Sequence, residues 1–261
     1  MKNVCLLAFA FLTLAVCRVY AGENNSATDT MRYQLVWADE FNGNRIDTTA
    51  WTFEAGNSGW GNNEHEFYQA SNATVKNGNL IITARKESVG TASYTSARMK
   101  TQGKKKFLFG RIEARIKIPV GQGLWPAFWM LGENISSVGW PKSGEIDIME
   151  HINTDSLLYG TAHWDGGKGH VQSGDTILFS PSVYHAYDVE WTPENIIWQV
   201  DGKEYHRLNI ANDTNNTAAF HQPFFILLNF AVGGNWPGHK IDESKLPASM
   251  YVDYVRVYEL K

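Results

Sequence analysis

Cysteine is scarce in this 261-residue sequence, and the 2 cysteines, Cys5 and Cys17, both lie close to its N-terminus. They fall within an apolar run that follows Lys2 and ends near the small residue Ala21. This arrangement is typical of a secretory signal peptide, and the run is too short to span a bilayer. We therefore expect residues 1–21 to be removed on export and the remaining chain to fold without a disulfide.

Two other interpretations of the N-terminus stay open. The apolar run could be a buried first element of the fold. The letters LAVC at 14–17 loosely resemble a lipoprotein signal, which would anchor the protein through Cys17, although Val16 is bulky for that cleavage. Residues 22–30, GENNSATDT, are polar and predict a disordered leader. Residues 31–261 contain no linker, repeat or low-complexity tract, so we expect one catalytic domain there.

Positive charge is also in short supply. Without residues 1–21, Lys plus Arg falls from 23 to 21 against 27 Asp plus Glu, a formal charge of −6. The short basic run GKKK at 103–106 is typical of a solvated turn. Nucleic acid and anionic membrane surfaces are therefore not expected as partners, and the expected substrate is neutral or weakly charged. We also expect the protein to be a monomer.

Helical periodicity is missing, and most patterned segments alternate with the period of a β-strand. RIEARIKI at 111–118 places four apolar side chains on one face, and NIIWQVDGKEYHRL at 195–208 predicts a hairpin that turns at Asp201-Gly202. FFILLNFAV at 224–232 is typical of a covered central strand. These segments predict an all-β sandwich or barrel, and a sandwich with one curved sheet would offer a concave face to an extended ligand.

Three carboxylates stand in the apolar segment SGEIDIMEHIN at 143–153, at Glu145, Asp147 and Glu150. Alternate residues of a strand share a face, so Glu145 and Asp147 lie together, whereas a regular strand would turn Glu150 toward the core. A β-bulge adds one residue and shifts this alternation. We therefore predict a bulge between Ile148 and Glu150, with Met149 as the extra residue, which returns the third acid to the face of the other two.

Three aligned carboxylates suit two kinds of chemistry. They could bind a hard cation, which prefers several oxygen ligands. They could instead hydrolyse a glycosidic bond, where a retaining enzyme holds a nucleophile and an acid/base about 5–5.5 Å apart. A third carboxylate between those two would keep the acid/base protonated through like-charge repulsion. The remaining alternative is a solvated acidic face without a function.

The segment GEIDIMEHIN at 144–153 resembles the active-site motif of glycoside hydrolase family 16 in its bulged form, E-x-D-x-x-E. Five further blocks resemble the laminarinase-type endo-1,3-β-glucanases of that family, so the similarity extends over essentially residues 31–261. They are LVWADEFNG (35–43), WGNNEHEFY (60–68), GRIEARIKIPVGQGLWPAFWMLG (110–132), YHAYDVEWTP (184–193) and YVDYVRVY (251–258).

This resemblance implies a β-jelly-roll sandwich of two curved antiparallel sheets, the concanavalin A-like lectin/glucanase fold, with an open concave cleft. It implies cleavage of internal β-1,3-glucosidic bonds of laminarin-like glucans by a retaining double displacement that needs no cofactor for catalysis. Glu145 then corresponds to the nucleophile, Asp147 to its helper and Glu150 to the general acid/base. Its implied partner is a β-glucan polysaccharide.

The resemblance also implies a set of substrate contacts. Aromatic faces stack on sugar rings, and amide and guanidinium groups orient sugar hydroxyls. By pattern alone Trp125 and Trp129 would more often be core residues, and for the lone polar residues a structural role is equally consistent. The predicted contacts are Trp125, Trp129, Trp236, Asn62, Arg98, Asn229, His163 and Trp164.

The resemblance is less specific at two positions, His163 and Glu66. His163 corresponds to a histidine that approaches the acid/base in the family and would tune its pKa, although a purely structural histidine fits the pattern as well. Glu66 stands where laminarinases more often carry glutamine. This departure puts the polar contacts around the neighbouring part of the cleft in doubt.

Many relatives hold a structural Ca²⁺ on the convex side. The corresponding positions are Glu40, Gly78 through its carbonyl, and Asp253, which together offer oxygen ligands suited to Ca²⁺, although they could be ordinary surface residues. Asn-x-Ser/Thr sequons are also present, and they matter only in a host that glycosylates secreted proteins. They begin at Asn24, Asn72, Asn134, Asn212 and Asn215.

Several functions compete with a laminarinase. A mixed-linkage β-1,3-1,4-glucan is a second substrate for the same chemistry, and agarase- or carrageenase-like galactan hydrolases share the bulged motif. A non-catalytic β-glucan-binding protein on the same fold would have lost one or both glutamates, and both are present here. A carboxylate-based metal protein would lose its activity or its fold in a chelator.

Overall fold

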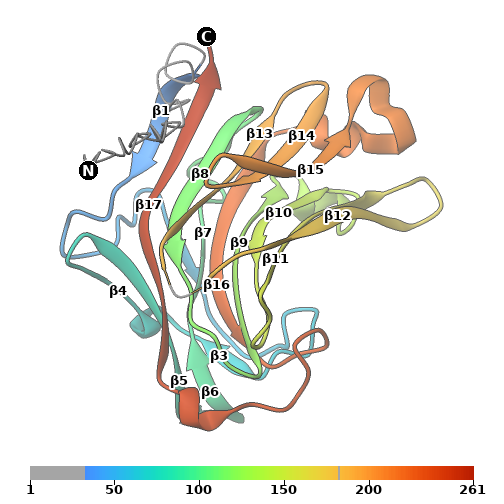
Figure 1. Cartoon of the computed structure of the whole chain (residues 1–261). Coiled ribbons are helices and arrows are strands. Elements are labelled where there is room, and N and C mark those ends of the chain that lie inside the picture. The colour runs from blue at the N-terminus through green and yellow to red at the C-terminus, as the bar shows by residue number, and fades with distance from the viewer. Residues whose placement is uncertain (1–32, 182) are drawn as a thin grey trace, which may run out of the picture.

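A computed structural model describes residues 33–181 and 183–261 as a sandwich of two β-sheets (Figure 1). The predicted signal peptide, the leader, Cys17 and the sequon at Asn24 lie outside the described residues. In the described ranges, no helix has the length and apolar character that a membrane crossing requires.

Ten strands form one sheet, and its neighbouring strands are antiparallel except for the pair β3–β6 within the described chain. β1 and β4 pair with β17 and β5, outside the main path. In spatial order the main path is β15 (Lys203–Asn209), β14 (Asn195–Val200), β13 (His185–Trp191), β8 (Gly110–Lys117), β17 (Ala248–Leu260), β5 (Asn79–Val89), β6 (Ala92–Ser96) and β3 (Glu66–Tyr68), and the two extra strands are β1 (Tyr33–Asp39) and β4 (Ala73–Lys76).

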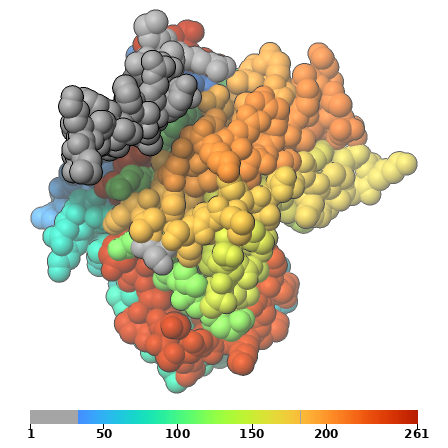
Figure 2. Space-filling model, viewed as in Figure 1, coloured from blue at the N-terminus to red at the C-terminus, as the bar shows by residue number. Residues whose placement is uncertain are grey.

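The second sheet has seven strands and carries the acid segment near its middle. Its order is β12 (His170–Leu178), β11 (Leu157–Asp165), β10 (Glu145–Glu150), β9 (Leu124–Gly132), β16 (Phe224–Val232), β7 (Arg98–Lys100) and β2 (Thr52–Glu54). Short helical turns connect the strands: η1 (Ala70–Asn72), α2 (Ile135–Val138), η2 (Ala211–His221) and η3 (Glu243–Lys245). The β11–β12 hairpin projects from the body of the molecule (Figures 1 and 2).

The main hydrophobic core lies between the two sheets and uses the alternation seen in the sequence. Ile112, Ala114 and Ile116 of β8 are completely buried there, in the same cluster as Ile146 and Ile148 of β10. The predicted all-β sandwich is confirmed. Burying each such aliphatic side chain contributes about 1.5–3 kcal/mol to folding before entropy is counted, so this interface holds the sheets in place.

The predicted hairpin and the predicted central strand are both present. Asp201 and Gly202 have φ of 51° and 73°, the left-handed values that a two-residue primed turn requires, and they join β14 to β15. Every residue of β16 is buried, as expected for its continuous apolar sequence. On its outer face, Phe225 and Leu227 belong to a small hydrophobic cluster that is separate from the main core.

The predicted bulge lies in β10, and it sets which side chains leave the core. Against β11, the register shifts between Asp147 and Glu150. Against β9, it shifts between Asp147 and Met149, so that Ile148, rather than the predicted Met149, is the residue without a partner there. Both apolar residues are completely buried, and Glu150 returns to the outer face.

Candidate active site

A cavity of about 370 Å³ lies on the face of the seven-stranded sheet that points away from the main core. Strands β7, β9, β10 and β16 supply its floor, and the segments before β3 and β10 supply its walls. It is lined by Trp60, Gly61, Asn62, Glu64, Arg98, Trp125, Ala127, Trp129, Leu131, Ile135, Trp140, Glu145, Asp147, Glu150 and Asn229.

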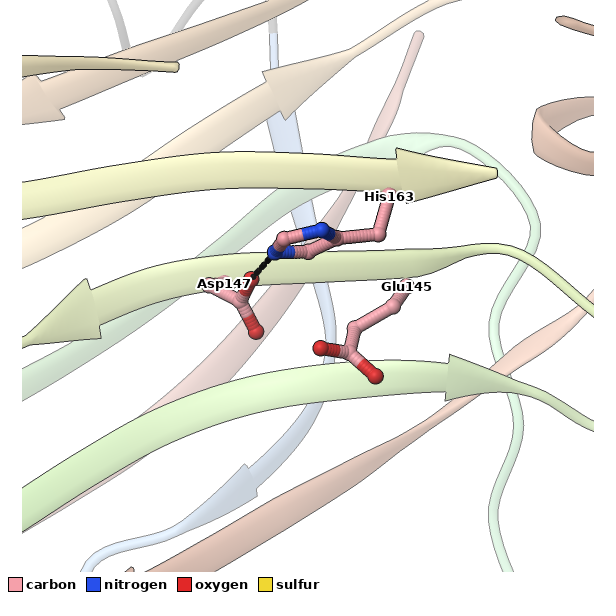
Figure 3. Close-up of side chains that lie close together, drawn as sticks. All are labelled: Glu145, Asp147 and His163. Atoms are coloured by element: carbon pink, nitrogen blue, oxygen red, sulfur yellow. Dashed lines mark ion pairs between the residues drawn. The ribbon is translucent and has the colours of Figure 1, made fainter. Parts of the chain in front are cut away.

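All three acids of β10 line this cavity, as the bulged alternation predicts. Glu145 and Glu150 are half-buried, and Asp147 between them is 3% exposed. Figure 3 shows Glu145 and Asp147 pointing to the same side of β10, with His163 of β11 beside them. One strand therefore presents three carboxyl groups to one hollow.

Each of the two glutamates accepts a hydrogen bond from a tryptophan ring. Nε1 of Trp140 donates to Oε2 of Glu145 at 3.1 Å, and Nε1 of Trp125 donates to Oε1 of Glu150 at 2.9 Å. The indole nitrogen is a donor only, so these bonds orient the carboxyl groups without supplying a charge. Asp147 instead faces His163, whose Nε2 lies 3.1 Å from its Oδ2 (Figure 3).

The pKa values of all three carboxyl groups are raised, first of all because burial disfavours their charged forms. The pKa of Glu145 rises to about 8, with the nearby Asp147 as the second cause, while His163, Trp140 and Arg98 act to lower it. The pKa of Glu150 is also raised well above its usual range, by burial, by Asp147 and by Glu145. Burial likewise raises the pKa of Asp147.

The two glutamates have different surroundings, which favour the ionisation of Glu145 before that of Glu150. His163 and Arg98 both favour the charged form of Glu145. Glu150 has two carboxyl groups that favour its neutral form, opposed by one tryptophan N–H and the more weakly acting His163. We therefore expect Glu145 to be the first of the two glutamates to ionise, while Glu150 keeps its proton.

Arg98 of β7 sits between aromatic rings at one end of the cavity. Its guanidinium lies 4.8 Å from the ring centre of Trp129 and 5.2 Å from that of Trp60. Its Nε donates to Oε2 of Glu54 at 2.6 Å, and Lys100 binds the other oxygen of that carboxylate. Charge pairing and stacking together fix Arg98 in one position.

A chain of hydrogen bonds links the floor of the cavity to its wall. Nε1 of Trp129 donates to Oδ1 of Asn229 at 2.7 Å, and Nδ2 of Asn229 donates to the Tyr68 hydroxyl at 3.1 Å. That hydroxyl donates to Oε2 of Glu64 at 2.7 Å, and Asn62 contacts the other oxygen of Glu64 at 3.4 Å. The predicted residues Asn62, Asn229 and Trp129 are thus connected through two residues that were not predicted.

Trp236 lies at the edge of this arrangement. It is 39% exposed and meets Trp125 edge-on at 5.4 Å and Tyr159 at 4.9 Å. It is absent from the cavity lining, but its contact with Trp125 places it beside that lining. Its position remains consistent with the predicted sugar platform.

The prediction that Trp164 contacts substrate is wrong. Its side chain is 3% exposed and belongs to the main core, where it meets Phe220 edge-on, and its Nε1 donates to the carbonyl of Asn215. Strand alternation is the reason, because β11 alternates without a bulge along its length. If His163 faces the cavity, its neighbour Trp164 must face the core.

Trp60, Glu64 and Trp140 line the cavity, although they were not predicted as site residues. The signal was present, since Trp60 and Glu64 stand in the block WGNNEHEFY and Trp140 precedes Glu145 by five residues in WPKSGE. Each lies in a loop or turn, where alternation gives no orientation. Only the folded chain shows that these three side chains line the same cavity as the acids.

Glu66, the residue that departs from the usual glutamine, is completely buried behind the cavity wall. Its Oε2 accepts from the Val232 backbone N–H at 2.6 Å, and its Oε1 has no hydrogen-bond partner in the described structure. Its pKa is raised well above the usual range by burial, then by the neighbouring Glu64. Burial therefore favours the neutral acid form of Glu66, which resembles glutamine in shape and charge.

The predicted calcium ligands do not present free carboxylates. Both oxygens of Glu40 accept from Arg256, at 2.7 and 2.9 Å, and Asp253 accepts from Arg115 at 2.6 Å. A cation bound through these side chains would therefore have to exchange with two arginines.

A second group of side chains could hold a metal ion by proximity alone. Ligand atoms of Glu145, Asp147 and His163 all lie within 4.8 Å of one another. Burial and mutual repulsion favour protonated carboxyl groups here, and a hard cation would require these oxygens as anions. The cluster is better suited to proton transfer than to metal binding.

The chain is similar in sequence to a known protein family and to known proteins. Residues 61–256 match glycosyl hydrolases family 16. A β-glucanase from Rhodothermus marinus is 39% identical over 269 residues, covering 96% of this chain and 93% of that protein. The clotting factor G alpha subunit of Tachypleus tridentatus is 45% identical over 233 residues, covering 87% of this chain but 34% of that protein.

Solved structures share the architecture as well as the sequence. The catalytic domain of an endo-1,3-β-glucanase (laminarinase) from Thermotoga petrophila superposes with a TM-score of 0.82 at 46% identity, covering 88% of this chain and 98% of that domain. Fold and sequence agree over the strands that carry the cavity. The chain belongs to glycosyl hydrolases family 16.

Proposed function

We propose that this protein cleaves internal β-1,3-glucosidic bonds of laminarin-like glucans with retention of configuration, using Glu145 as the nucleophile and Glu150 as the general acid/base. The supporting observation is the arrangement on β10, where the bulge brings both glutamates and Asp147 to one cavity. The family match and the similarity to a laminarinase domain support the substrate class.

In the first step, a carboxylate oxygen of Glu145 attacks the anomeric carbon and the bond to the leaving oxygen breaks. Glu150 gives its proton to that oxygen, so the shortened glucan leaves as an alcohol and the remaining sugar is esterified to Glu145. In the second step, Glu150 takes a proton from water, whose oxygen attacks the anomeric carbon and releases Glu145. Two inversions give a β-configured product, and no cofactor takes part.

The electrostatics support this division of roles. A nucleophile must be ionised, and Arg98 and His163 both favour the charged form of Glu145. A general acid must carry a proton, and burial together with Asp147 holds the proton on Glu150. Because all these pKa values are raised, we expect a bell-shaped pH dependence displaced toward higher pH than an exposed carboxyl pair would give.

Substrate binding in this proposal uses the aromatic and polar lining. Trp125 and Trp129 stand four residues apart on β9 and both line the cavity, so successive sugars can stack along it. Asn62, Arg98 and Asn229 supply donors and acceptors for hydroxyl groups. These five residues, with Trp236 at the rim, form the proposed glucan-binding surface.

We also propose that the protein is secreted, as its N-terminal sequence predicts, and that it acts as a monomer on an extracellular polysaccharide. The alternative of a lipid anchor on Cys17 predicts a membrane-bound protein, and fractionation of the native host distinguishes the secreted form from the anchored form.

Calcium at Glu40, Gly78 and Asp253 remains a prediction. A rise in melting temperature with Ca²⁺ that is lost in Asp253→Asn would support it, and an unchanged melting temperature would contradict it.

Product analysis of the purified protein tests the activity. Laminarin, mixed-linkage glucan, agarose and carrageenan would each be incubated with the wild type and with Glu145→Gln, and the newly formed ends followed by NMR. We expect internal cleavage of laminarin into β-configured products by the wild type alone. Cleavage of a galactan only would overturn the substrate, and tight glucan binding without cleavage would overturn the enzymatic activity.

A further inference from the structure

His170, the first residue of β12, links two groups that contact the acids of the active site. Its Nε2 lies 2.9 Å from Nδ1 of His163, and the two rings are stacked with centres 5.1 Å apart. The ring of His170 also lies 4.7 Å from that of Trp140, whose ring centre is 6.2 Å from that of His163. His170 was not singled out by its sequence and does not line the cavity.

Both neighbours of His170 reach a carboxyl group of β10. His163 places its Nε2 3.1 Å from Asp147, and Trp140 donates to Glu145 at 3.1 Å. The side chains therefore form a closed ring of contacts from Glu145 through Trp140, His170 and His163 to Asp147. Three segments that are separate in sequence meet in this ring.

The proton on His163 decides what this ring can do. A neutral imidazole has one N–H donor and one acceptor nitrogen, and the partner of one nitrogen determines which form is present. Nε2 of His163 can donate to Asp147 while the ring stays neutral only if Nδ1 is an acceptor. The group that can donate to Nδ1 is the Nε2–H of His170, at 2.9 Å.

We propose that His170 is a positioning residue: it donates its Nε2–H to Nδ1 of His163 and so keeps the proton of His163 on Nε2, the nitrogen that lies 3.1 Å from Oδ2 of Asp147. This inference rests on the proposed function, because it describes how the charged form of Asp147 is favoured, against the effect of its burial, beside the general acid. A polar N–H group close to a carboxyl group favours the charged form of that group. The Asp147 anion in turn favours the protonated form of Glu150, the form that a general acid requires.

Packing does not account for the position of His170. Its side chain is exposed, on the edge strand of the seven-stranded sheet, and it belongs to no described core cluster. Opposite it in the register stands Asp165, whose Oδ1 accepts from the backbone N–H groups of Gly167 and Gly169 in the hairpin turn. Lys168 is the other charged residue of that turn, and Glu145 and Asp147 are the charged groups that face His163.

A second histidine pair offers a matched control. Nε2 of His65 lies 2.8 Å from Nδ1 of His239, and the rings are stacked with centres 5.0 Å apart. Neither of these two histidines contacts Glu145, Asp147 or Glu150 in the contacts of the described chain. The same substitution at His239 therefore removes a similar contact without touching the active site.

The test compares His170→Phe, His170→Gln and His239→Phe with the wild type in pH profiles of kcat and kcat/KM on laminarin. Phenylalanine keeps the stacked ring but has no donor, so we expect kcat to fall roughly 5- to 10-fold and the alkaline limb to move to lower pH, with KM little changed. The amide N–H of glutamine can still donate to His163 and should restore most of kcat. His239→Phe should match the wild type. Equal profiles for His170→Phe and the wild type would overturn the proposal.

A measurement without substrate separates this inference from the proposed function. Ring ¹⁵N chemical shifts of His163 report which nitrogen carries the proton. We expect the proton on Nε2 in the wild type and in His170→Gln, and a shift of the population toward Nδ1 in His170→Phe. A proton on Nδ1 of His163 in the wild type would overturn the proposal, whether or not the protein hydrolyses glucan.

Discussion

Carboxyl groups on the two sheets have different hydrogen-bonding partners. On the ten-stranded sheet, Glu113 is 6% exposed and is bound by Arg111, which also lies 3.3 Å from Asp188. On the seven-stranded sheet, Glu145 and Glu150 are contacted by tryptophan N–H groups instead of a guanidinium. Both environments are poor in water, but only the first supplies a full positive charge at contact distance.

This difference separates stability from chemistry. A buried carboxylate paired with arginine stays charged and contributes to the structure, because removing either partner leaves the other charge uncompensated. A buried carboxyl group without a cation holds its proton more tightly, which makes it useful for proton transfer and unfavourable for stability above its normal pKa. The cleft acids therefore reduce stability in exchange for reactivity, as is common at functional sites.

The largest expected effect is on turnover. Glu145→Gln removes the nucleophile while preserving shape, and we expect kcat on laminarin to fall at least about 10³-fold. Glu113→Gln on the other sheet should leave kcat unchanged and lower the free energy of unfolding by about 1–3 kcal/mol, because it weakens the Arg111 pairing and the hydrogen bond from Tyr254. Assays of kcat and urea denaturation on both variants check the pair. If Glu145→Gln retains turnover, Glu145 is not the nucleophile.

The next largest effect is expected when the β-bulge that brings the three acids to one face is removed. Deleting Ile148 removes the extra residue and should turn Glu150 toward the main core, as the regular alternation requires. We expect loss of hydrolysis and a fall of at least about 3 kcal/mol in the free energy of unfolding. Thermal denaturation with an activity assay measures both. Ile148→Val keeps the bulge and serves as the control, with an expected cost of about 1 kcal/mol. Full activity in the deletion variant would rule out the role given to the bulge.

A smaller effect concerns the pH dependence of stability at Glu66. Its folded-state pKa is raised well above the value of 4.5 that applies to the unfolded chain, so the unfolded chain binds fewer protons between those two pKa values. Stability is then complete below the unfolded pKa and falls by up to about 1.4 kcal/mol per pH unit as pH rises.

Glu66→Gln should remove this dependence. We expect the variant to unfold like the wild type at pH 4 and to be more stable at pH 8, as measured by chemical denaturation at both values. Glu54→Gln is the contrast, because Arg98 and Lys100 help hold the pKa of Glu54 below its usual value against its burial. That variant should lose stability at pH 8. Equal stabilities of Glu66→Gln and the wild type at pH 8 would contradict the neutral state assigned to Glu66.

The smallest effect is expected where a cation pairs with a carboxylate in contact with solvent. Glu40 and Arg256 have side-chain exposures of 38% and 32%, so water screens their attraction. Glu40→Gln should change the free energy of unfolding by less than about 1 kcal/mol and leave kcat unaffected. A loss as large as that of Glu113→Gln would show that exposure does not separate the two pairs.

Much of the fold follows from local patterns in the sequence. Alternation predicted the strands that pack Ile112 and Ile146 into the core, and the positions of Asp201 and Gly202 predicted the primed hairpin turn. The acid spacing predicted the bulge because a buried, unpaired Glu150 would be costly. These features depend on residues close together in sequence, where strand geometry leaves few choices.

The parts that were missed depend on loops and on contacts between distant segments. Trp140 reaches Glu145 from a turn, and Glu64 reaches the cavity from an irregular segment, so no period indicates their direction. Trp164, by contrast, was predicted to contact substrate but lies in the core. The family resemblance grouped it with His163, although two adjacent residues of a regular strand cannot face the same side.

The identity of the nucleophile is most directly tested by azide rescue. Each of the variants Glu145→Ala and Glu150→Ala would be incubated with azide and a β-1,3-linked glucose oligosaccharide that carries a β-linked aryl leaving group at its reducing end. NMR would then determine the anomeric configuration of the glycosyl azide that forms. If Glu145 is the nucleophile, azide attacks from its vacated face and Glu145→Ala gives the α-azide. Glu150→Ala should give the β-azide, because azide then opens the ester on Glu145. A β-azide from Glu145→Ala with an α-azide from Glu150→Ala would contradict the assignment and exchange the two roles.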